Sequence, residues 1–520
     1  MGAGPSGLMA AVELARRGVT IRLVERAPEP HGQARATAVQ SATMELLAQA
    51  GVAQDFLDHS VHVRHARVYD ASLRTVAESS FAGGAAVGCP FEFQCSLPQW
   101  STERILAGRL TELGGTVERG VSAVSLDERE DHVLAWLEHA DGTMESVRAG
   151  WVIGAGGAHS MTRESMAEPL EGSTYRGTAL VADMRVSCGL PRDASALIAS
   201  PAGYVFLAPL PDDRWLSFIG DLTRQEELQL AADRSPRAVE SVISRRAPGA
   251  VGVDEVAWAA PFQMHRRLAP RLADGRRFLL GDAGHLSSPF GGEGLNSGLH
   301  DASNLAWKLA LATRGQARPV LLASYAAERR AADEHVLAVS DQVHQLAYSA
   351  VESARSGIPA PQLAPSEAAA LLRARSMLDV SYAASPLTGE YAGHAGSGHA
   401  DPAGAGHAGH AGDGHAGRVG DPGGAAPGER YPGRLSLAGI RHHLLLNGPA
   451  DPAALTRLRR RWAGLVDIGT AAGPDSPARA PAGGALLIRP DGYVGFRAAT
   501  ADADGLAAVE DHLATYLLPG

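Results

Sequence analysis

The clearest pattern of apolar and polar positions lies between Phe278 and Ala312. An apolar run over residues 278–280 predicts a buried strand that ends before Asp282, and a loop rich in proline and glycine follows it. A helix is then expected, because apolar residues recur at intervals of four, three, four and three residues, namely Leu295, Leu299, Ala302, Ala306 and Leu309. With one face of this helix buried, the amides of its first turn are left to bind a negatively charged group.

A second pattern opens the chain, where Gly2, Gly4 and Gly7 form a Gly-x-Gly-x-x-Gly turn. Apolar residues at helical spacing follow, and a short β-rich run over residues 20–24 ends at Glu25. This order is typical of a dinucleotide-binding unit, in which glycines admit the pyrophosphate and the acid binds ribose hydroxyls. A tight turn without a ligand is the alternative for the glycines alone. The sequence holds one such fingerprint, so a second dinucleotide is expected to bind only transiently.

The start of this unit is unusual. In dinucleotide-binding units the glycine turn follows a buried parallel strand, whereas only Met1 precedes it here. We therefore expect the first strand of the sheet to be missing, which would leave two neighbouring strands with unpaired backbone groups that cost about 1 to 3 kcal/mol each. Our hypothesis is that the chain starts at a codon that is normally internal.

The remaining sequence divides into three parts. Short β-like runs between residues 165 and 270 predict a separate sheet, whose aromatic side chains either line a substrate pocket or fill a core: Tyr204, Phe206, Trp215, Phe218, Trp258 and Phe262. The tract 392–428 consists mainly of Gly, Ala and His, so it predicts a disordered linker, and its irregular histidine spacing disfavours a metal site. Alternating runs over 434–497 and a helical run near 502–517 predict a small α/β unit without cysteine.

Composition narrows the range of partners. The formal net charge of −10 argues against nucleic acid or an anionic membrane surface, because both need a basic face. No apolar run is long enough to predict a membrane span. Three scattered cysteines fit neither a disulfide framework nor a zinc site, which indicates a reducing cytoplasm. No metal site and no hydrolase triad are predicted.

Together, the glycine turn and the 278–312 block resemble the single-component FAD-dependent aromatic hydroxylases, typified by para-hydroxybenzoate and phenol hydroxylases. The resemblance is greatest to polyketide-tailoring members of antibiotic biosynthesis that carry a C-terminal thioredoxin-like domain. It covers residues 1 to about 345 well and 429–500 weakly. It implies an α/β fold with a Rossmann-like FAD domain at 1–165 and 271–345, an inserted β-sheet substrate domain at 166–270, a helical connector at 346–391, the linker at 392–428 and a thioredoxin-like domain at 429–520.

The resemblance also implies the residues that bind FAD. Asp282, next to Gly281, would bind the ribityl hydroxyls, while Pro289 and Gly292 would wall the isoalloxazine. His285 is interpreted as a structural hydrogen-bonding residue and not as a base. The other implied FAD contacts are Gly2, Gly4, Gly7, Glu25, Arg35, Gln99, the backbone of Val124, Gly294, Leu295 and Asn296.

Two positions depart from the family pattern. Gly156 stands where relatives carry an aspartate that helps to bind FAD and to orient the nicotinamide, and Ala42 stands where many relatives have an arginine. Both changes remove polar groups from the expected neighbourhood of the cofactor. The first of them affects a position that serves reduction by NAD(P)H.

The function that the resemblance implies is hydroxylation of an electron-rich phenolic substrate of polyketide type, with FAD, NAD(P)H and O2, through a C4a-hydroperoxyflavin. The flavin would carry the chemistry, so no catalytic side chain is assigned. Oxygen insertion of the Baeyer-Villiger type and a degenerate, non-catalytic flavin-binding relative remain as alternatives. A flavin halogenase is disfavoured, because the sole lysine, Lys308, lies on the helix predicted at 301–311. A homodimer is compatible with the resemblance.

Overall fold

The computed structural model describes residues 1–34, 36–82, 88–360, 362–393, 425–432, 439–470 and 481–519. The chain forms two compact units. Unit 1 comprises Met1–Ser381 with Arg434–Ile440, and unit 2 comprises Tyr382–Gly433 with Arg441–Gly520. Most of the predicted linker at 392–428 lies outside the described residues. No helix in the described part of the chain is long and apolar enough to cross a membrane.

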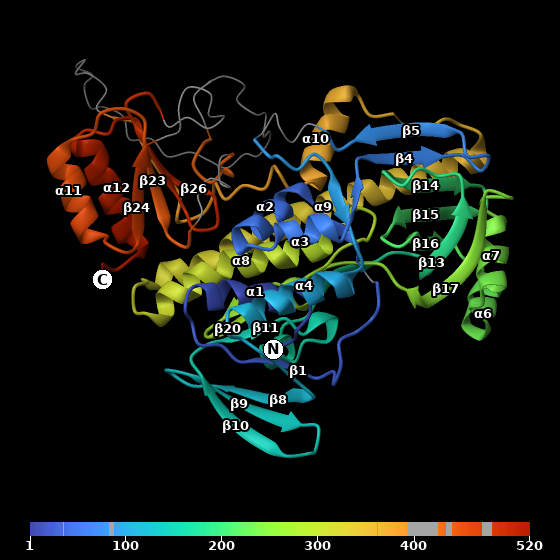
Figure 1. Ribbon diagram of the computed structural model, residues 1–520, viewed down its shortest axis with the longest axis horizontal. Coiled ribbons are helices and arrows are strands. Elements are labelled where there is room, and N and C mark those ends of the chain that lie inside the picture. The colour runs from blue at the N-terminus through green and yellow to red at the C-terminus, as the bar shows by residue number, and fades with distance from the viewer. Residues whose placement is uncertain are drawn as a thin grey trace, which may run out of the picture. The chain divides into compact units, whose positions relative to one another are not determined.

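Unit 1 is built around two helices that carry the two motifs of the sequence. Helix α1 (Pro5–Arg16) follows the glycine turn, and α8 (Gly294–Thr313) follows the glycine-rich loop. Figure 1 shows the two helices lying alongside each other. The predicted stripe of α8 is confirmed, because its apolar positions from Leu299 to Leu309 are buried against α1 and α4 (Gln99–Glu112) in one core.

Two short parallel pairs of strands flank α1. One pairs β1 (Leu23–Glu25) with β7 (Val117–Arg119), and the other pairs β11 (Val152–Gly154) with β20 (Arg277–Leu279), which also pairs with β19 (Ala273–Asp274). The first element in the described residues is α1, which directly follows the glycine turn.

The backbone of the first two residues joins these two pairs of strands. The Met1 amine donates to the Ile153 carbonyl, Ala155 N donates to the Met1 carbonyl, and Gly2 N donates to Val24 O. A cavity of about 410 Å³ lies beside this connection and is lined mainly by apolar residues, among them Leu14 of α1, Leu23 of β1, Val152 of β11 and Leu137. Burial lowers the pKa of the Met1 amine to about 6.

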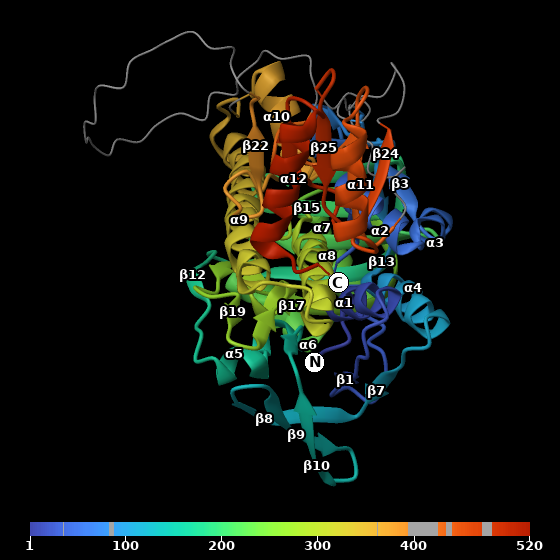
Figure 2. The same cartoon turned by 90° about the vertical axis from the view of Figure 1, so that its left-hand side faces the viewer.

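A three-stranded antiparallel sheet follows β7 and consists of β8 (Val121–Glu128), β9 (Val133–His139) and β10 (Met144–Ala149). Figure 2 shows this sheet below β1 and β7. The strand predicted near Val124 is therefore present. Alternating burial along β9 indicates a sheet with one face packed and one face exposed.

The predicted second sheet of unit 1 has seven strands in the order β17-β13-β16-β15-β14-β4-β5. Segment 166–270 supplies five of these strands, and β4 and β5 come from an earlier part of the chain. Helices α6 (Arg224–Ala232) and α7 (Pro236–Ser244) pack on one face, and α9 (Pro319–Ser356) packs on the other. The strands are β13 (Ala179–Cys188), β14 (Ala194–Ser200), β15 (Gly203–Pro209), β16 (Arg214–Gly220), β17 (Val251–Phe262), β4 (His65–Tyr69) and β5 (Thr75–Ser80).

Shorter elements connect these parts of unit 1. Two small three-stranded sheets have the orders β2-β6-β3 and β12-β18-β21. The first consists of Ala38–Val39, Gln94–Ser96 and Val61–Val63, and the second of Glu171–Thr174, His265–Leu268 and His285–Leu286. The remaining helices are α2 (Ser41–Ala50), α3 (Ala53–Asp58), α5 (Met161–Ser165), α10 (Pro365–Arg375) and the 3-10 turns Gly157–His159 and Gly281–Ala283.

Unit 2 is a mixed five-stranded sheet with two helices. Its strand order is β22-β26-β25-β23-β24, with β22 parallel to β26 and β23 parallel to β24. This agrees with the small α/β unit predicted from the sequence. The elements are β22 (Gly389–Tyr391), β23 (His442–Leu446), α11 (Pro452–Arg461), β24 (Val466–Thr470), β25 (Ala485–Ile488), β26 (Val494–Ala498) and α12 (Ala503–Tyr516).

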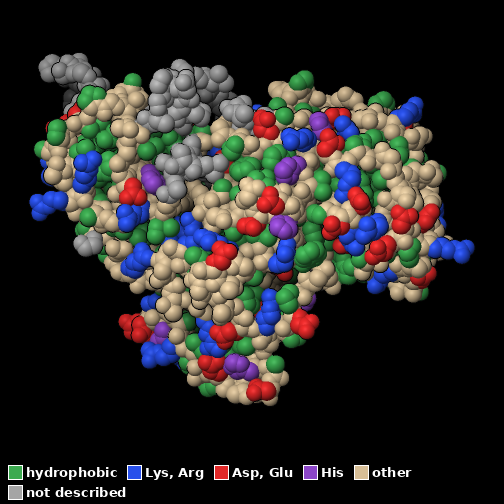
Figure 3. All heavy atoms as spheres, in the orientation of Figure 1, with side chains coloured by type: hydrophobic (Ala, Val, Ile, Leu, Met, Phe, Trp, Pro, Cys, Tyr) green, Lys and Arg blue, Asp and Glu red, His purple; other side chains and the backbone are tan. Residues whose placement is uncertain are grey.

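Charge is distributed differently on the surface and in the interior. Acidic and basic side chains are intermixed on the face shown in Figure 3. Inside unit 1, Lys308 of α8 is fully buried, and its Nζ donates to Glu328 Oε2 of α9 at 2.7 Å and to Asn304 Oδ1 at 2.8 Å. A buried ion pair of this kind fixes how two helices meet, but it becomes costly when one partner is lost.

We predict that Lys308→Met destabilises unit 1 by about 3 to 5 kcal/mol, because it leaves the Glu328 carboxylate buried without its cation. Urea unfolding followed by tryptophan fluorescence measures this change. The double variant Lys308→Met/Glu328→Leu removes both charges and is expected to recover most of the loss. Equal stability of the single variant and the wild type would contradict a stabilising role of the buried Lys308–Glu328 ion pair.

Candidate active site

The glycine turn before α1 requires glycine at two of its positions. Gly2 has a φ of +96°, and a Cβ on it would lie 2.3 Å from the Ala155 carbonyl oxygen. A Cβ on Gly7 would lie 2.0 Å from the Gly2 carbonyl oxygen, whereas Gly4 has open space around it. The turn therefore leaves room at Gly4 while its other glycines permit tight packing, as a phosphate-binding turn needs.

Glu25 reaches this turn from the end of β1. Its Oε2 accepts a hydrogen bond from Ala3 N at 2.8 Å, and its Oε1 accepts one from Ala27 N at 2.9 Å. The carboxylate is thus fixed against the glycine turn by two backbone amides. The predicted contact to a ribose hydroxyl would start from this position.

The second motif approaches the first one through Ser6. Gly281 has a φ of +56°, and a Cβ on it would lie 2.4 Å from Ser6 Oγ. A Cβ on Gly298 of α8 would lie 2.1 Å from the same hydroxyl oxygen. Asp282 is exposed although Gly281 and Ala283 on either side are buried. The structure therefore brings Gly281, the residue before Asp282, against Ser6 of the glycine turn.

The loop before α8 is held by one side chain. Asn296 Oδ1 accepts a hydrogen bond from Gln40 N at 2.8 Å, and its Nδ2 donates to Ala38 O at 2.8 Å and to Gly292 O at 2.7 Å. Pro289 O accepts from Gly292 N at 3.1 Å. The Asn296 side chain therefore positions the loop, and a contact of residue 296 to a ligand falls to its backbone amide.

Three amides remain at the start of α8. The first intrahelical bond runs from Ser297 N to Glu293 O at 2.8 Å, so the amides of Gly294, Leu295 and Asn296 precede it. The helix begins one residue earlier than the sequence predicted. These amides and the positive end of the helix favour a negatively charged ligand group.

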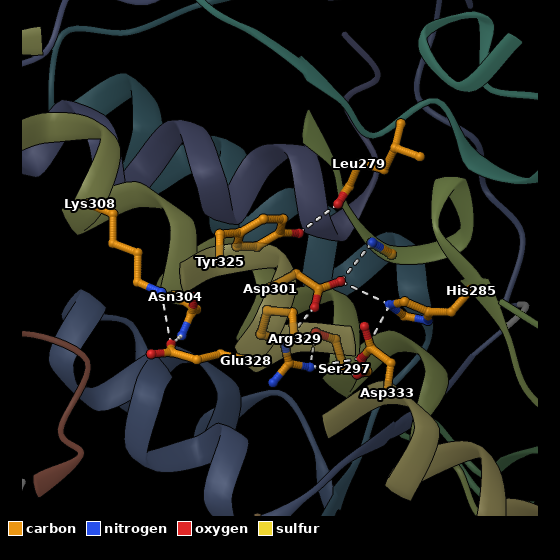
Figure 4. Close-up of polar contacts among 11 residues, drawn as sticks. Leu279, His285, Ser297, Asp301, Asn304, Lys308, Tyr325, Glu328, Arg329 and Asp333 are labelled. Atoms are coloured by element: carbon orange, nitrogen blue, oxygen red, sulfur yellow. Dashed lines mark hydrogen bonds and ion pairs between the residues drawn. The ribbon is translucent and has the colours of Figure 1, made fainter. Parts of the chain in front are cut away.

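A buried polar network lies beneath this first turn (Figure 4). Asp301 Oδ2 accepts hydrogen bonds from Gly281 N at 2.9 Å and from His285 Nε2 at 2.8 Å, and Asp301 Oδ1 accepts one from Arg329 Nε at 2.6 Å. Arg329 also donates to Asp333 Oδ1 at 2.9 Å. Asp301 thereby fixes the backbone immediately before Asp282.

The charged groups of this network shift one another's pKa values. The nearby carboxylates of Asp333 and Asp301 raise the pKa of His285 to about 9 against the opposing effect of burial, so the imidazole is cationic at neutral pH. Arg329 and His285 lower the pKa of Asp301 to about 2 although burial opposes the shift. His285, Asp301 and Asp333 are spaced like metal ligands, but the Arg329 guanidinium contacts both carboxylates and supplies the positive charge there.

Other predicted positions lie at the periphery. Gln99 begins α4 and donates to Glu103 Oε1 at 2.8 Å, while burial raises the pKa of Glu103 and the charge of Glu25 adds to that rise. Val124 is 45 % exposed beside a bulge in β8, so its backbone is open to a ligand. Arg35 lies outside the described residues.

The two departures from the family pattern have different surroundings. Ala42 is fully buried in α2, and its amide donates to Ser376 O at 3.1 Å. A Cβ on Gly156 would lie 3.6 Å from Ser160 Cα, so a side chain would fit there. Gly156 also lies within 2.9 Å of the position that a Cβ on Gly2 would take, which places it at the glycine turn.

The predicted aromatic pocket residues separate between the two faces of the seven-stranded sheet. Tyr204, Phe206, Phe218 and Trp258 pack on the face toward α9, and Phe262 contacts Phe218 with ring centroids 6.2 Å apart. Trp215 packs on the other face against α6 and α7, so for this residue the core-filling alternative holds. The cause is the two-residue period of β16, which turns residue 215 away from residue 218.

The aromatic face of the sheet meets the glycine-rich loop. Phe290 of that loop contacts Tyr204 with ring centroids 5.1 Å apart. Ser288 Oγ and His344 Nδ1 of α9 form a hydrogen bond at 2.9 Å. The loop predicted to wall a flavin is therefore continuous with the face predicted to wall a substrate.

Sequence reasoning did not find several residues of this site. Ser6 occupies a variable position of the glycine turn, and Gln40 and Arg329 belong to no sequence motif, so that the roles of all three depend on contacts between distant segments. Glu293 could have been found from the sequence, since it places a charged side chain among the glycines of Gly291-Gly-Glu-Gly294, where close backbone packing is expected.

Comparison with known proteins agrees with this arrangement. Residues 1–340 match the family model of a FAD binding domain, and residues 428–516 match that of an aromatic-ring hydroxylase C-terminal domain. The chain is 33 % identical to 6-methylpretetramide 4-monooxygenase of Streptomyces rimosus over 100 % of this chain and 93 % of that protein. It is 30 % identical to pentachlorophenol 4-monooxygenase of Sphingobium chlorophenolicum over 66 % of this chain and 64 % of that protein.

Solved structures resemble the whole chain. The anhydrotetracycline hydroxylase OxyS of Streptomyces rimosus aligns with a TM-score of 0.75 and 27 % identity over 100 % of this chain and 98 % of that one. Aklavinone-11 hydroxylase in a ternary complex with FAD and aklavinone aligns with a TM-score of 0.77 and 26 % identity, covering 98 % and 97 % of the two chains.

We predict a pH dependence of stability from His285. Because its folded pKa of about 9 lies above the ordinary value of 6.5, its contribution is fully present below about pH 6.5 and is lost as the pH rises through about 9. That contribution amounts to roughly 3 kcal/mol. Urea unfolding at low and high pH is expected to show this loss in the wild type and not in His285→Gln. Parallel pH profiles of the two proteins would refute the cationic imidazole.

Proposed function

The chain belongs to the family of FAD-dependent aromatic-ring hydroxylases and is a flavin-dependent monooxygenase, and we propose that it hydroxylates a phenolic ring of a polycyclic, polyketide-type substrate with O2. The observation that carries this proposal is the contact between the loop before α8 and the aromatic face of the sheet, through Phe290 and Tyr204. It joins an expected flavin site to a wall suited to flat aromatic ligands.

The residues present fit FAD. The glycine turn at Gly2 to Gly7 admits the pyrophosphate, and Glu25 lies against that turn to bind the adenosine ribose. Asp282 is exposed and directly follows Gly281, which lies against Ser6 of the glycine turn, and we propose that it binds the ribityl chain. We propose that Gly281, Gln99, Arg35 and the backbone of Val124 supply the supporting contacts.

The ring system would lie against the loop and the first turn of α8. Pro289 and Gly292 form its wall, and Gly292 must be a glycine there, with a φ of +74° and a Cβ position 2.9 Å from Ala38 Cβ. The amides of Gly294, Leu295 and Asn296 stabilise negative charge on the pyrimidine edge of the ring. These groups are preorganised, because Asn296 and Asp301 fix the backbone on both sides of the site.

The bound flavin supplies electron transfer from NAD(P)H and the activation of O2. The protein excludes water by closing the loop against the sheet with Phe290. It orients the substrate through the ring faces of Phe206, Phe218 and Trp258. Because the flavin supplies the redox chemistry and the protein only orients the substrate and excludes water, no titrating side chain needs to contact the substrate.

A substrate panel tests the proposed function directly. Purified protein with bound FAD is mixed with NADH or NADPH, O2 and polycyclic phenols, and products are analysed by mass spectrometry. A gain of one oxygen on an aromatic carbon supports hydroxylation, and the same mass gain in an ester or lactone favours the Baeyer-Villiger alternative. Protein that fails to retain FAD would support the degenerate relative and refute the proposal.

We predict that Asp282→Ala weakens FAD binding at least about tenfold, which corresponds to the loss of roughly 1.4 kcal/mol from a charge-assisted hydrogen bond. Fluorescence titration of apoprotein with FAD measures the dissociation constant. Asp274→Ala, a partly exposed acid at β19, is the matched control and should bind FAD as the wild type does. Equal affinities for Asp282→Ala and the control would contradict the role of Asp282.

We predict that the two faces of the sheet respond differently to substitution. Phe206→Ala removes an aromatic wall on the face toward the loop and is expected to raise KM for the phenolic substrate about tenfold. Trp215→Phe acts on the opposite face and is expected to leave KM unchanged. Steady-state kinetics of NAD(P)H oxidation measure both values. A larger KM effect at residue 215 would place the substrate elsewhere.

A further inference from the structure

Glu293 is the most unusual ionisable residue of unit 1. It is the N-cap residue of α8, between Gly292 and Gly294, and its side chain is 0 % exposed. Neither of its carboxylate oxygens has a hydrogen-bond partner among the residues that the structure describes. Buried carboxylates are nearly always paired, because removing an ion from water without compensation is costly. A buried carboxylate that lacks such a partner beside a ligand site is free to gain and lose a proton, which an ion pair would prevent.

The carboxylate lies directly under the loop that would wall the flavin. A Cβ on Gly291 would come within 1.7 Å of Glu293 Oε2, so the acid packs against the loop backbone itself. From the other side, Gln40 Nε2 donates to the Gly291 carbonyl at 3.2 Å. The Glu293 carboxylate therefore packs directly against the backbone of Gly291.

Two cationic groups face Glu293 from neighbouring helices. Arg375 at the end of α10 and His335 of α9 both interact with its charge, and neither of them forms a hydrogen bond or ion pair with its carboxylate in the described structure. His335 Nε2 is bonded to Asp379 Oδ2 at 3.1 Å, and this pair is partly exposed to solvent. Burial raises the pKa of Glu293 to about 7, and the charges of Arg375 and His335 limit that rise.

An ionised Glu293 and a reduced flavin would both place negative charge at the positive end of α8. Two negative charges close together in a buried site raise each other's proton affinity. Negative charge arriving on the ring therefore makes Glu293 harder to ionise.

From this geometry we propose that Glu293 takes up a proton when the bound flavin is reduced and releases it on reoxidation. The proposal rests on the flavin site given above. Two electrons and one proton, delivered to N5, convert the oxidised flavin to its anionic reduced form. A second proton from solvent adds to a Glu293 oxygen, and the His335–Asp379 pair lies on the exposed side from which it comes. Glu293 is then neutral while the flavin is negative.

The midpoint potential of the bound flavin tests this coupling. One proton per two electrons gives a slope of about 30 mV per pH unit, and two protons give about 59 mV. Above about pH 7.5, where Glu293 is ionised in the oxidised protein, the wild type is expected to show the larger slope and Glu293→Gln the smaller one. Asp183→Asn, at a buried acid of β13 whose pKa is also raised, is the control and should keep the larger slope.

The apoprotein gives a second measurement that needs no flavin. Because the folded pKa of Glu293 lies above its ordinary value, stability falls as the pH rises from about 4.5 through 7. Glu293→Gln is expected to lack this fall, and the infrared band of a protonated carboxyl near neutral pH should disappear with it.

The outcomes separate this inference from the proposed function. Protein that binds FAD and hydroxylates phenols, but shows the same slope in the wild type and Glu293→Gln, overturns the proton coupling alone. Protein that binds no FAD overturns both proposals. A wild-type slope of about 59 mV that falls to about 30 mV only in Glu293→Gln supports the coupling.

Discussion

The carboxylate of Asp301 is the contact on which the site of unit 1 depends. It accepts hydrogen bonds from the backbone of Gly281, from His285 and from Arg329, which belong to the 3-10 turn after β20, to β21 and to α9. The side chains of His285 and Arg329 are buried with the carboxylate. Asp301 remains ionised in spite of its burial, because these two cations contact it. One side chain of α8 thereby fixes the segment that carries Asp282 and the helix that packs beneath it.

The glycines of the site follow from the same constraint. Asp301 holds Gly281 so close to α1 that Ser6 Oγ lies within 2.4 Å of where a Cβ would be. Gly298 of α8 meets the same hydroxyl. A larger residue at either position would separate α1 from α8 and move the glycine turn away from Asp282. The two motifs, far apart in sequence, are therefore adjacent because three small side chains permit it.

The local patterns of the sequence predicted much of this fold. The helical stripe of α8, the glycine turn followed by Glu25 and the strands of both units all depend on short-range patterns, and the structure shows each of these elements. The sequence left Trp215 open between pocket and core, because a list of aromatic residues does not say which face of a strand each one occupies. The contributions of Arg329, Gln40 and Ser6 could not be predicted, since each acts through a partner hundreds or tens of residues away. The chemistry assigned to the site came from the resemblance and not from periodicity.

Helix α9 connects the two halves of the site. Near its middle, Arg329 and Asp333 belong to the network under the first turn of α8. Two turns later Ser340 Oγ donates to Ser288 O at 2.9 Å, and His344 bonds the Ser288 hydroxyl, which fixes the loop before Pro289. Further along, Ala347 and Val351 pack under the aromatic face of the sheet. Because one continuous helix contacts the polar network, the loop and the sheet in succession, helix geometry sets the distance between the proposed flavin site and the proposed substrate wall. The spacing that oxygen transfer would need therefore does not depend on the loop alone.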